Sequence, residues 1–329
     1  MGSLLHPDQF PDSLWLPNFT SAAHPGKKGT LQVPIELQSA YIAALHEVGV
    51  HDQATSDSEE ESGIIGGVED NEAEQHFAKR FSASLGRFQL FALDPNHKFS
   101  TTLDALIGAF AGGSVRILDV PFGAGASTLT LVSIIAELRE KGQLERRPLE
   151  VHITGGDLSE KSLKIGHMLL SQIKPWWERQ NIAAHFALSK WDVLDSDSTT
   201  DLTDQWLTGD PATDRYVFAG GNFSGFLGAT VVEGGAERWM HRASSQLKHI
   251  ITRGAKRHLH VFWVEPQIKQ AKKHFLPFLS QEVIGTTKRL TPLFQGTRED
   301  DSMMGSCLVP DDVFVTRAAG IQFKRTEPT

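Results

Sequence analysis

Val115-Arg-Ile-Leu-Asp-Val-Pro-Phe-Gly-Ala-Gly-Ala-Ser-Thr-Leu129 is an apolar strand that ends in an acid, followed by a glycine turn and the start of a helix. Gly123 and Gly125 let the backbone take φ/ψ values that a Cβ would penalise and come close to a bound molecule. The free N–H groups at the start of the helix then point at the same place. The stretch therefore predicts a ligand-binding turn between a strand and a helix.

The position of the acid indicates which ligand the turn binds. In a dinucleotide fold the glycine turn accepts a pyrophosphate, and an acid about 20 residues later holds the ribose. Here Asp119 precedes the glycines, where its charge would repel a diphosphate and attract an ammonium or sulfonium. That favours S-adenosylmethionine over NAD. A phosphate-loop NTPase is excluded because no Gly-Lys-Ser/Thr follows the glycines.

Asp119-Val-Pro-Phe-Gly-Ala-Gly125 resembles the first motif of the class I S-adenosylmethionine-dependent methyltransferases, an acid followed by three alternate glycines. Pro121 stands in place of the first of those glycines, and it still suits a rigid turn. The resemblance implies that residues 119–125 contact the cofactor.

Three further segments follow in the order of that family. Val151 to Leu163 resembles the second strand, whose terminal acid, here Asp157, binds the ribose hydroxyls. Trp191-Asp-Val193 resembles the segment that contacts adenine, with Asp192 as partner of the amino group. Asp214 to Leu227 resembles the fourth strand and the loop below the transferable methyl. The cofactor-binding residues implied are Asp119, Pro121, Phe122, Gly123, Gly125, Asp157, Leu158, Asp192 and Gly220. A helix N-cap is the alternative role for the acids, above all for Asp157.

The fold class predicted is α/β, a mainly parallel doubly wound sheet with helices on both faces, an antiparallel C-terminal strand pair and a helical N-terminal extension. Short apolar runs typical of buried strands predict strands over 115–119, 150–155, 183–188, 215–219 and 259–264. Helices are expected over 125–141, 160–179, 231–253 and 267–279, and the closing strands over 283–295 and 312–324. Ligands of such sheets bind at the carboxyl ends of the strands.

The chain divides into residues 1–113, an arm and helical cap, and residues 114–329, the methyltransferase-like cofactor-binding and catalytic domain. Residues 1–35 are expected to be irregular, and helices are expected over 35–48, 72–92 and 100–111. The acidic stretch 52–74 predicts a solvated loop. The cap either covers the sheet edge or roofs the substrate pocket.

Composition agrees with an enzyme of this kind. The 329 residues are 40% hydrophobic, which is ample for a large core. The single cysteine, Cys307, excludes an internal disulfide framework and is consistent with a cytoplasmic protein. No apolar run of 18 residues occurs, so no membrane span is predicted, and the N-terminus has no signal-peptide pattern. No metal site is predicted.

Charge is distributed unevenly. The formal net charge is −8, yet residues 241–290 contain ten Lys and Arg against Glu265 and Glu282. Two interpretations stay open: these are the solvent faces of two late helices, or they form a patch that contacts RNA, since phosphate binding needs clustered basic residues.

Methyl transfer requires no covalent chemistry from the protein, because the sulfonium is already a good electrophile and positioning supplies much of the acceleration. Candidate catalytic residues are Asn222 and Phe223, in the loop after the fourth strand, and Glu265, at the end of the fifth. That loop is not of the Asn-Pro-Pro-Tyr type, which disfavours amino-methylation of DNA adenine. Arg80 and Arg87 either bind the methionine carboxylate or are ordinary helix-surface arginines.

The function predicted is S-adenosylmethionine-dependent methyl transfer to an undetermined acceptor, with RNA slightly favoured over a small molecule or a protein. One alternative is a non-catalytic partner subunit that retains the fold, which the replacement of a motif glycine by Pro121 keeps open. Another is an NAD-dependent oxidoreductase.

Overall fold

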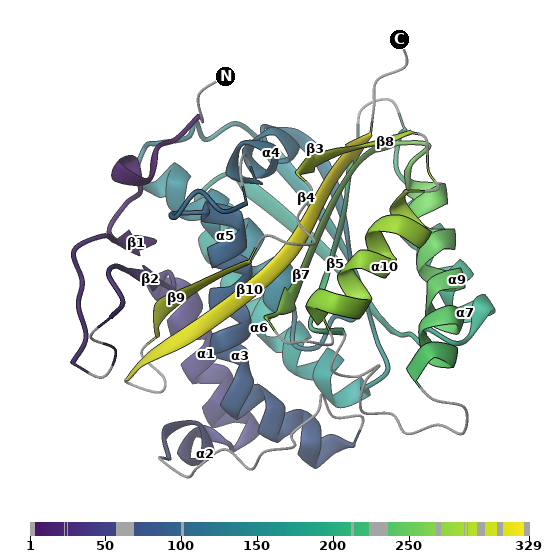
Figure 1. Ribbon diagram of the computed structural model, residues 1–329. Coiled ribbons are helices and arrows are strands. Elements are labelled where there is room, and N and C mark those ends of the chain that lie inside the picture. The colour runs from purple at the N-terminus through teal and green to yellow at the C-terminus, as the bar shows by residue number, and fades with distance from the viewer. Residues whose placement is uncertain are drawn as a thin grey trace.

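A parallel sheet of five strands forms the centre of the protein. The structure, a computed structural model, describes residues 4–22, 24, 26–56, 69–99, 102–211, 214–223, 236–267, 271–285, 287, 289–294, 300–307 and 312–325. The parallel strands lie in the order β5-β4-β3-β6-β7 (Figure 1). Their bounds are β3 Gly113–Asp119, β4 Leu149–Asp157, β5 Ile182–Lys190, β6 Arg215–Gly221 and β7 His258–Pro266. All five predicted strands are confirmed.

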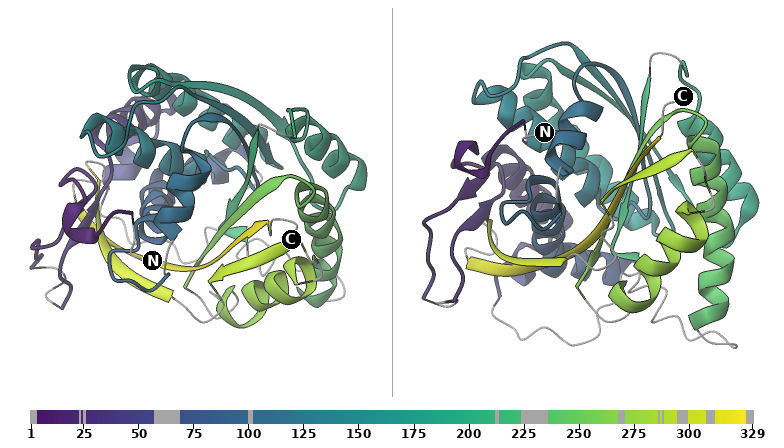
Figure 2. Two further views of the ribbon diagram at one scale, coloured as in Figure 1. Left: turned by 90° about the horizontal axis from the view of Figure 1, so that it is seen from above. Right: turned by 45° about the horizontal axis from the view of Figure 1, so that its top comes forward.

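The helices lie in two groups on opposite sides of this sheet (Figure 2). On one side, α3, α5 and α6 contact one another, and on the other α7 contacts α9. Their bounds are α3 Asp70–Leu93, α5 Ala126–Glu140, α6 Glu160–Arg179, α7 Ser196–Trp206 and α9 Ala236–Gly254. The sheet is therefore doubly wound as predicted. The first residues of the helix expected over 231–253 lie outside the described residues.

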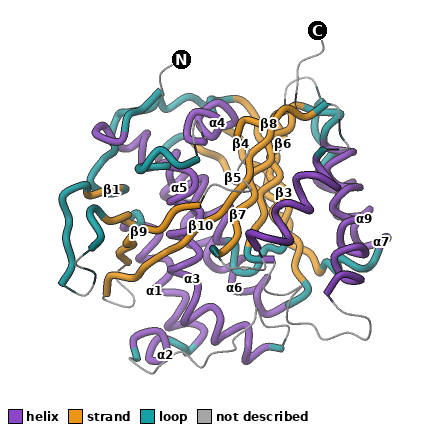
Figure 3. Tube along the Cα trace, viewed as in Figure 1, coloured by secondary structure: helices purple, strands orange, loops and turns teal. Residues whose placement is uncertain are grey.

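Antiparallel strands close the sheet beyond β7. The long strand β10 (Asp312–Arg325) pairs with β7, and on its other side it pairs first with β9 (Asp300–Cys307) and then with β8 (Leu290–Phe294). The antiparallel C-terminal pair is thus confirmed, and β9 is an addition that the sequence did not predict. Arrows in Figure 1 and the orange trace in Figure 3 show β10 crossing the front of the molecule.

The chain after β7 stays helical for longer than expected. Helical turns run through η2 (Ala271–Phe275), α10 (Leu276–Phe278) and η3 (Leu279–Ile284). The prediction of a strand from residue 283 was wrong at its start, because Phe275, Leu276, Leu279 and Ile284 are buried and hold the segment against the core. Residues 268–270 lie outside the described residues.

The N-terminal arm was predicted to be irregular, but part of it belongs to the sheet. After a short turn of helix, η1 (Pro7–Gln9), strand β1 (Trp15–Leu16) pairs with β2 (Thr30–Gln32), and β2 pairs in parallel with β9. Leu14 and Leu31 are fully buried, so the arm is anchored by its apolar side chains. Strands of two and three residues are too short to carry a periodic signal.

The N-terminal helices share one hydrophobic core with the sheet. Helices α1 (Ile35–Val48), α3 and α4 (Thr102–Ala109) confirm the three predicted helices. Phe77, Phe81, Leu85, Phe88 and Phe91 of α3 are buried. The division of the chain at residue 113 stays a prediction. No helix among the described residues has an apolar stretch long enough to cross a bilayer.

The acidic stretch 52–74 is not a loop at either end. Helix α2 (His51–Thr55) occupies its start, and α3 begins at Asp70. Asp70 and Glu72 fall in the first turn of α3, where acidic side chains are favoured by the helix dipole. Residues 57–68 lie outside the described residues.

Phe122 fills the space beneath the glycine turn. Its side chain is buried, and a Cβ on Gly155 of β4 or on Gly166 of α6 would lie 2.6 or 2.4 Å from its ring. Both positions need glycine because the ring occupies the volume that a methyl group would take. The turn is therefore supported from below by an aromatic side chain packed on two glycines.

We predict that Gly166→Ala destabilises the protein by about 1–3 kcal/mol, because the new methyl group would overlap a ring that cannot withdraw from the core. Urea denaturation followed by circular dichroism measures the loss. The matched control is Gly108→Ala in α4, where a Cβ meets nothing within 4 Å and alanine favours the helix by about 1 kcal/mol. An equal effect of the two substitutions would contradict the packing described for Phe122.

Candidate cofactor site

The candidate site lies at the carboxyl edge of the parallel strands. After β3 the chain continues outward to β4 and β5, and then returns to β6 on the other side of β3. The order of the strands therefore reverses between β3 and β6, which is where open α/β sheets bind ligands. Asp119, Asp157 and Asn222 follow or end the strands β3, β4 and β6 at this edge.

Asp119 is buried beneath the turn, with 1% of its surface exposed. Its Oδ2 accepts hydrogen bonds from the backbone N of Thr128 at 3.1 Å and from Thr128 Oγ1 at 2.7 Å. Its Oδ1 has no hydrogen-bond partner among the described residues. Burial is the main reason that the pKa of Asp119 rises to about 7. The hydroxyl groups of Ser127 and Thr128 and the backbone N–H of Thr128 oppose the rise, and the charge of Asp157 adds to it.

Asp157 fixes the turn itself. Its Oδ2 accepts a hydrogen bond from Gly123 N at 2.7 Å, and its Oδ1 accepts one from Ser159 N at 2.9 Å. Burial raises the pKa of Asp157 above its usual value, and the backbone N–H donors oppose the rise. The N-cap of α6 is Ser159, whose Oγ accepts from Ser162 N, so Asp157 is not the cap.

Gly123 and Gly125 both have positive φ, 55° and 83°. Each therefore holds a backbone conformation that L side chains rarely adopt. The N–H of Gly123 points at a carboxylate of the protein, so this turn cannot offer that donor to a pyrophosphate. Asp119 and Asp157 lie close enough for their charges to interact.

Asp192 lies beside Asp157 at the end of β5. Trp191 N donates to the backbone O of Asp157 at 2.9 Å, and Asp192 Oδ1 accepts from Leu194 N at 2.9 Å. The side chains of Asp192 and Leu158 are partly exposed. Helix α7 is capped by Asp195, not by Asp192. The structure thus brings Asp157, Leu158 and Asp192 together at one edge.

Packing explains the side chain at Phe122 and the absence of one at Gly220, two of the predicted cofactor residues. The ring of Phe122 lies under the turn, so Phe122 has only its backbone to offer a ligand. A Cβ on Gly220 would lie 2.6 Å from the ring of Trp263 and 2.8 Å from Val120 O, which explains glycine there without a ligand. Pro121 is partly exposed on the turn.

The catalytic candidates differ in access. Phe223 is buried among the rings of Trp191, Trp263 and Phe275, with centroid distances of 6.0–6.4 Å. Glu265 is completely buried and accepts hydrogen bonds from Trp263 Nε1 at 2.7 Å and from Phe223 N at 3.1 Å. Neither arrangement fits a side chain that stacks on a substrate or takes a proton from one.

Asn222 is the candidate that stays accessible. It is partly exposed, has a φ of 58°, and its N donates to Val264 O at 3.1 Å. Arg87 Nη1 donates to Asn222 Oδ1, and Asn222 Nδ2 donates to Ser84 Oγ at 3.4 Å. Helix α3 thus supplies polar side chains to this edge. The sequence leaves two roles open for Arg87, contact with the methionine carboxylate and the ordinary helix surface. The polar positions 76, 80, 84 and 87, spaced along one side of an aromatic helix, are the available signal for a shared polar face.

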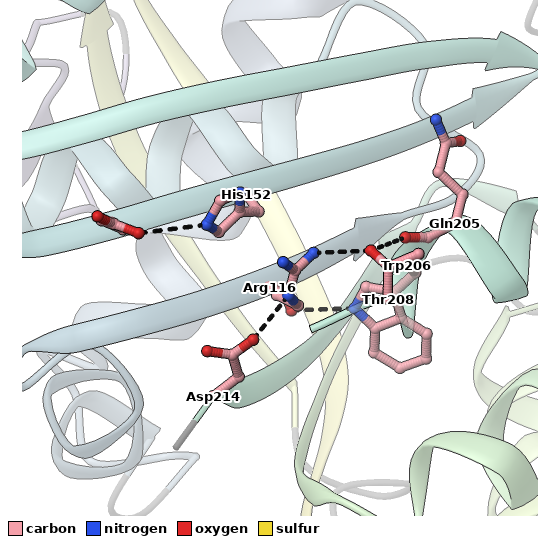
Figure 4. A network of polar contacts seen from close by, with 7 residues as sticks. Arg116, His152, Gln205, Trp206, Thr208 and Asp214 are labelled. Atoms are coloured by element: carbon pink, nitrogen blue, oxygen red, sulfur yellow. Dashed lines mark hydrogen bonds and ion pairs between the residues drawn. The ribbon is translucent and has the colours of Figure 1, made fainter. Parts of the chain in front are cut away.

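A second polar network lies at the opposite, amino end of the strands (Figure 4). Arg116 pairs with Asp214 at 2.8 Å and donates to Thr208 Oγ1 at 3.2 Å, while Trp206 Nε1 donates to the backbone O of Arg116. On the neighbouring strand β4, His152 Nε2 lies 3.6 Å from Glu150 Oε2. This network joins β3 to the end of α7 and the start of β6.

Part of the basic segment 241–290 lies at that amino end. Arg253 pairs with Asp204, and Arg257 lies over the ring of Tyr216, 5.8 Å from its centroid. Lys272 and Lys273, in η2, follow β7 and so lie beyond its carboxyl end. The side chains of Arg242, Lys269 and Lys288 lie outside the described part. The described basic side chains of the segment therefore lie at both ends of the strands.

The strand order β5-β4-β3-β6-β7, continued by an antiparallel β10, is the Rossmann-like architecture of class I methyltransferases. The resemblance stated from the motifs is confirmed at the level of the fold. Fold alone does not define an activity.

No family model and no curated protein matches the chain. Among solved structures it is similar to a proposed RNA methyltransferase from Pyrococcus horikoshii, with 7% identity over 86% of this chain and 100% of that chain and a TM-score of 0.33. It is also similar to the rRNA methyltransferase AviRa from Streptomyces viridochromogenes, with 10% identity over 72% and 84% of the two chains and a TM-score of 0.33. A third, described for the conversion of a disulfide bond into a thioacetal group during echinomycin biosynthesis, has 12% identity over 71% and 82% and a TM-score of 0.32. At these identities and TM-scores the similar structures carry no evidence about the function, so the function is inferred from the residues of the site.

We predict that Asp119→Asn removes a pH dependence of stability. Because the pKa of about 7 in the folded state exceeds the unfolded value of about 3.9, the folded state binds the proton more tightly. The free energy of unfolding of the unsubstituted protein therefore falls as the pH rises from about 4 to about 7, by roughly 4 kcal/mol at most. Denaturation at pH 4.5 and pH 8 should show a smaller fall for the variant. Parallel pH profiles would contradict the buried ionisable carboxyl.

Proposed function

We propose that this protein is an S-adenosylmethionine-dependent methyltransferase. The observation that carries the proposal is the bond from Gly123 N to the Asp157 carboxylate, made beside the buried carboxyl group of Asp119. The bond leaves the turn without the donor that a pyrophosphate needs, and the two acids favour a positively charged ligand.

The residues present fit the cofactor. Asp119 keeps one buried oxygen, Oδ1, without a hydrogen-bond partner among the described residues, which suits a nearby cationic or N–H group. Asp157 and Asp192 are at the ends of neighbouring strands, where they would hold the ribose hydroxyls and the adenine amino group. When bound, S-adenosylmethionine supplies a methyl group on a positively charged sulfur.

The chain's own contribution to the reaction is binding and orientation. Asn222 is held by Arg87 and Ser84, so its amide has a fixed direction at the end of β6. A fixed polar group beside the acceptor lowers the entropy that alignment costs. Glu265, being buried and hydrogen-bonded, would support Phe223 and Trp263 rather than remove a proton. The proposed mechanism therefore uses positioning without a general base from Glu265.

The acceptor is left as RNA, a small molecule or a protein. Lys272 and Lys273 support an RNA contact on the side of the candidate site, whereas Arg253 and Arg257 at the far end do not. If RNA is bound through several lysines and arginines, its affinity for the protein should fall steeply with added salt. A cytoplasmic location remains part of the proposal and rests on the single cysteine.

We predict that isothermal titration detects binding of S-adenosylhomocysteine and S-adenosylmethionine, and that Asp157→Asn weakens both by about 10- to 100-fold. The amide loses the charge and one of the two acceptors that orient the turn, worth about 1.5–3 kcal/mol. The control is Asp201→Asn, an exposed acid of α7 that removes the same charge away from the carboxyl edge.

The same titration separates the alternatives. Binding of NADH with an affinity equal to or above that of S-adenosylhomocysteine would favour an oxidoreductase. A folded protein that binds neither nucleoside would favour the non-catalytic partner subunit. Transfer of labelled methyl from the cofactor to a fraction of cell extract would establish the activity and identify the acceptor.

A further inference from the structure

The guanidinium of Arg87 lies at the carboxyl edge and uses two of its donors on described residues. Arg87 Nε donates to the backbone O of Arg317 at 3.2 Å, and Nη1 donates to Asn222 Oδ1. These two bonds join α3 to the first half of β10 and to the end of β6. A guanidinium has five N–H donors. Among the described residues, the other three make no hydrogen bond.

Those three donors are not on an open surface. Arg87 is only partly exposed, and burial lowers its pKa to about 10, with Glu265 raising it and Arg80 lowering it. The group therefore stays protonated at neutral pH. A partly buried cation with donors that the described residues leave unused is poorly compensated by those residues. An acceptor from outside the protein would complete its coordination.

The surroundings favour a negatively charged acceptor. Arg80 lies two turns before Arg87 on the same helix, and His76 lies one turn before Arg80. Burial, with smaller contributions from the charges of Arg80 and Arg87, lowers the pKa of His76 to about 4. His76 is thus neutral at pH 7. A planar guanidinium with parallel donors suits a carboxylate or phosphate.

The competing explanation is structural. Arg87 could serve only to tie α3 to β6 and β10 through the two bonds that it makes. That role uses Nε and one hydrogen of Nη1, and it gives no function to Nη2. The two explanations differ in how much the anionic group of a ligand contributes to its affinity for the protein, and that contribution can be measured.

We propose that Arg87 forms a subsite for a carboxylate or phosphate at the carboxyl edge of the sheet, beside Asn222. The identity of the anion rests on the proposed function: it is either the methionine carboxylate of the cofactor or an acidic group on the methyl acceptor. Arg87 is a specificity residue in either case.

The first arm compares S-adenosylhomocysteine with its decarboxylated analogue by isothermal titration. If Arg87 binds the methionine carboxylate, the unsubstituted protein should prefer S-adenosylhomocysteine by about 10- to 100-fold, the range for a charge-assisted pair. Arg87→Gln should abolish the preference and change the affinity for the analogue by less than about threefold. Arg87→Lys should retain part of the preference, because it keeps the charge and loses the fork.

The second arm tests the acceptor as the source. With S-adenosylhomocysteine bound at saturation, inorganic phosphate is titrated into the protein and followed by NMR. Millimolar binding that Arg87→Gln removes would support an anionic acceptor. The control in both arms is Arg317→Gln, the same substitution at an exposed side chain whose backbone alone contacts Arg87. Thermal unfolding checks that each variant is folded.

An equal loss of affinity for S-adenosylhomocysteine and for its analogue in folded Arg87→Gln would overturn the subsite and support the purely structural role. So would a protein that shows neither the carboxylate preference nor phosphate binding. If the unsubstituted protein binds no nucleoside, the proposed function fails. Phosphate titration of the protein alone, with and without Arg87→Gln, then still decides the subsite.

Discussion

The hydrogen bond from Gly123 N to Asp157 is the contact on which the arrangement of the site depends. It links the turn after β3 to the end of β4, and Phe122 N strengthens the link by donating to Gly156 O at 2.8 Å. Below, the ring of Phe122 packs where Gly155 and Gly166 leave room. A turn held from the side by a carboxylate and from below by an aromatic ring is fixed before any ligand arrives, so ligand binding need not order it.

This constraint also sets the charge pattern of the edge. Two carboxylates, Asp119 and Asp157, lie on the β3–β4 side, whereas Arg87 contacts Asn222 at the end of β6 and lies close enough to Glu265 and Arg80 for their charges to affect its pKa. Burying a carboxylate costs free energy, and a second carboxylate beside it adds to the cost: burial is the main reason for the raised pKa of Asp119, and the charge of Asp157 is a smaller one. A ligand with a cationic and an anionic group would offset both costs.

How much the sequence predicts depends on the length and burial of each element. The five parallel strands follow from short apolar runs, and α1 and α3 from helical spacing over 14 and 24 residues. Strands β1 and β2 were missed because two or three residues have no period. Strand β9 reads Asp300-Asp-Ser-Met-Met-Gly-Ser-Cys307, which lacks the β-branched residues typical of strands.

The candidate site was predictable as a set of strand ends but not as a set of side-chain directions. Topology places Asp119, Asp157 and Asp192 at one edge, as expected. A motif does not say which way a side chain points. Phe122, Phe223 and Glu265 turn into the core, where close packing selects them, while Arg87 reaches the edge from a helix more than 30 residues before the first motif. Those directions depend on contacts between distant segments.

The direction of α9 limits what the basic segment can do. Helix α9 leads into the amino end of β7, so Arg253 and Arg257, near its end, lie at the opposite edge of the sheet from Asp119 and Asp157. The amino and carboxyl ends of the strands are separated by the strand length, about 20–30 Å for seven to nine residues. That separation exceeds the screening length of about 8 Å at physiological salt. Basic residues at the amino edge therefore contribute little to holding an acceptor at the site, and recognition there depends on groups at the carboxyl edge such as Arg87 and Asn222.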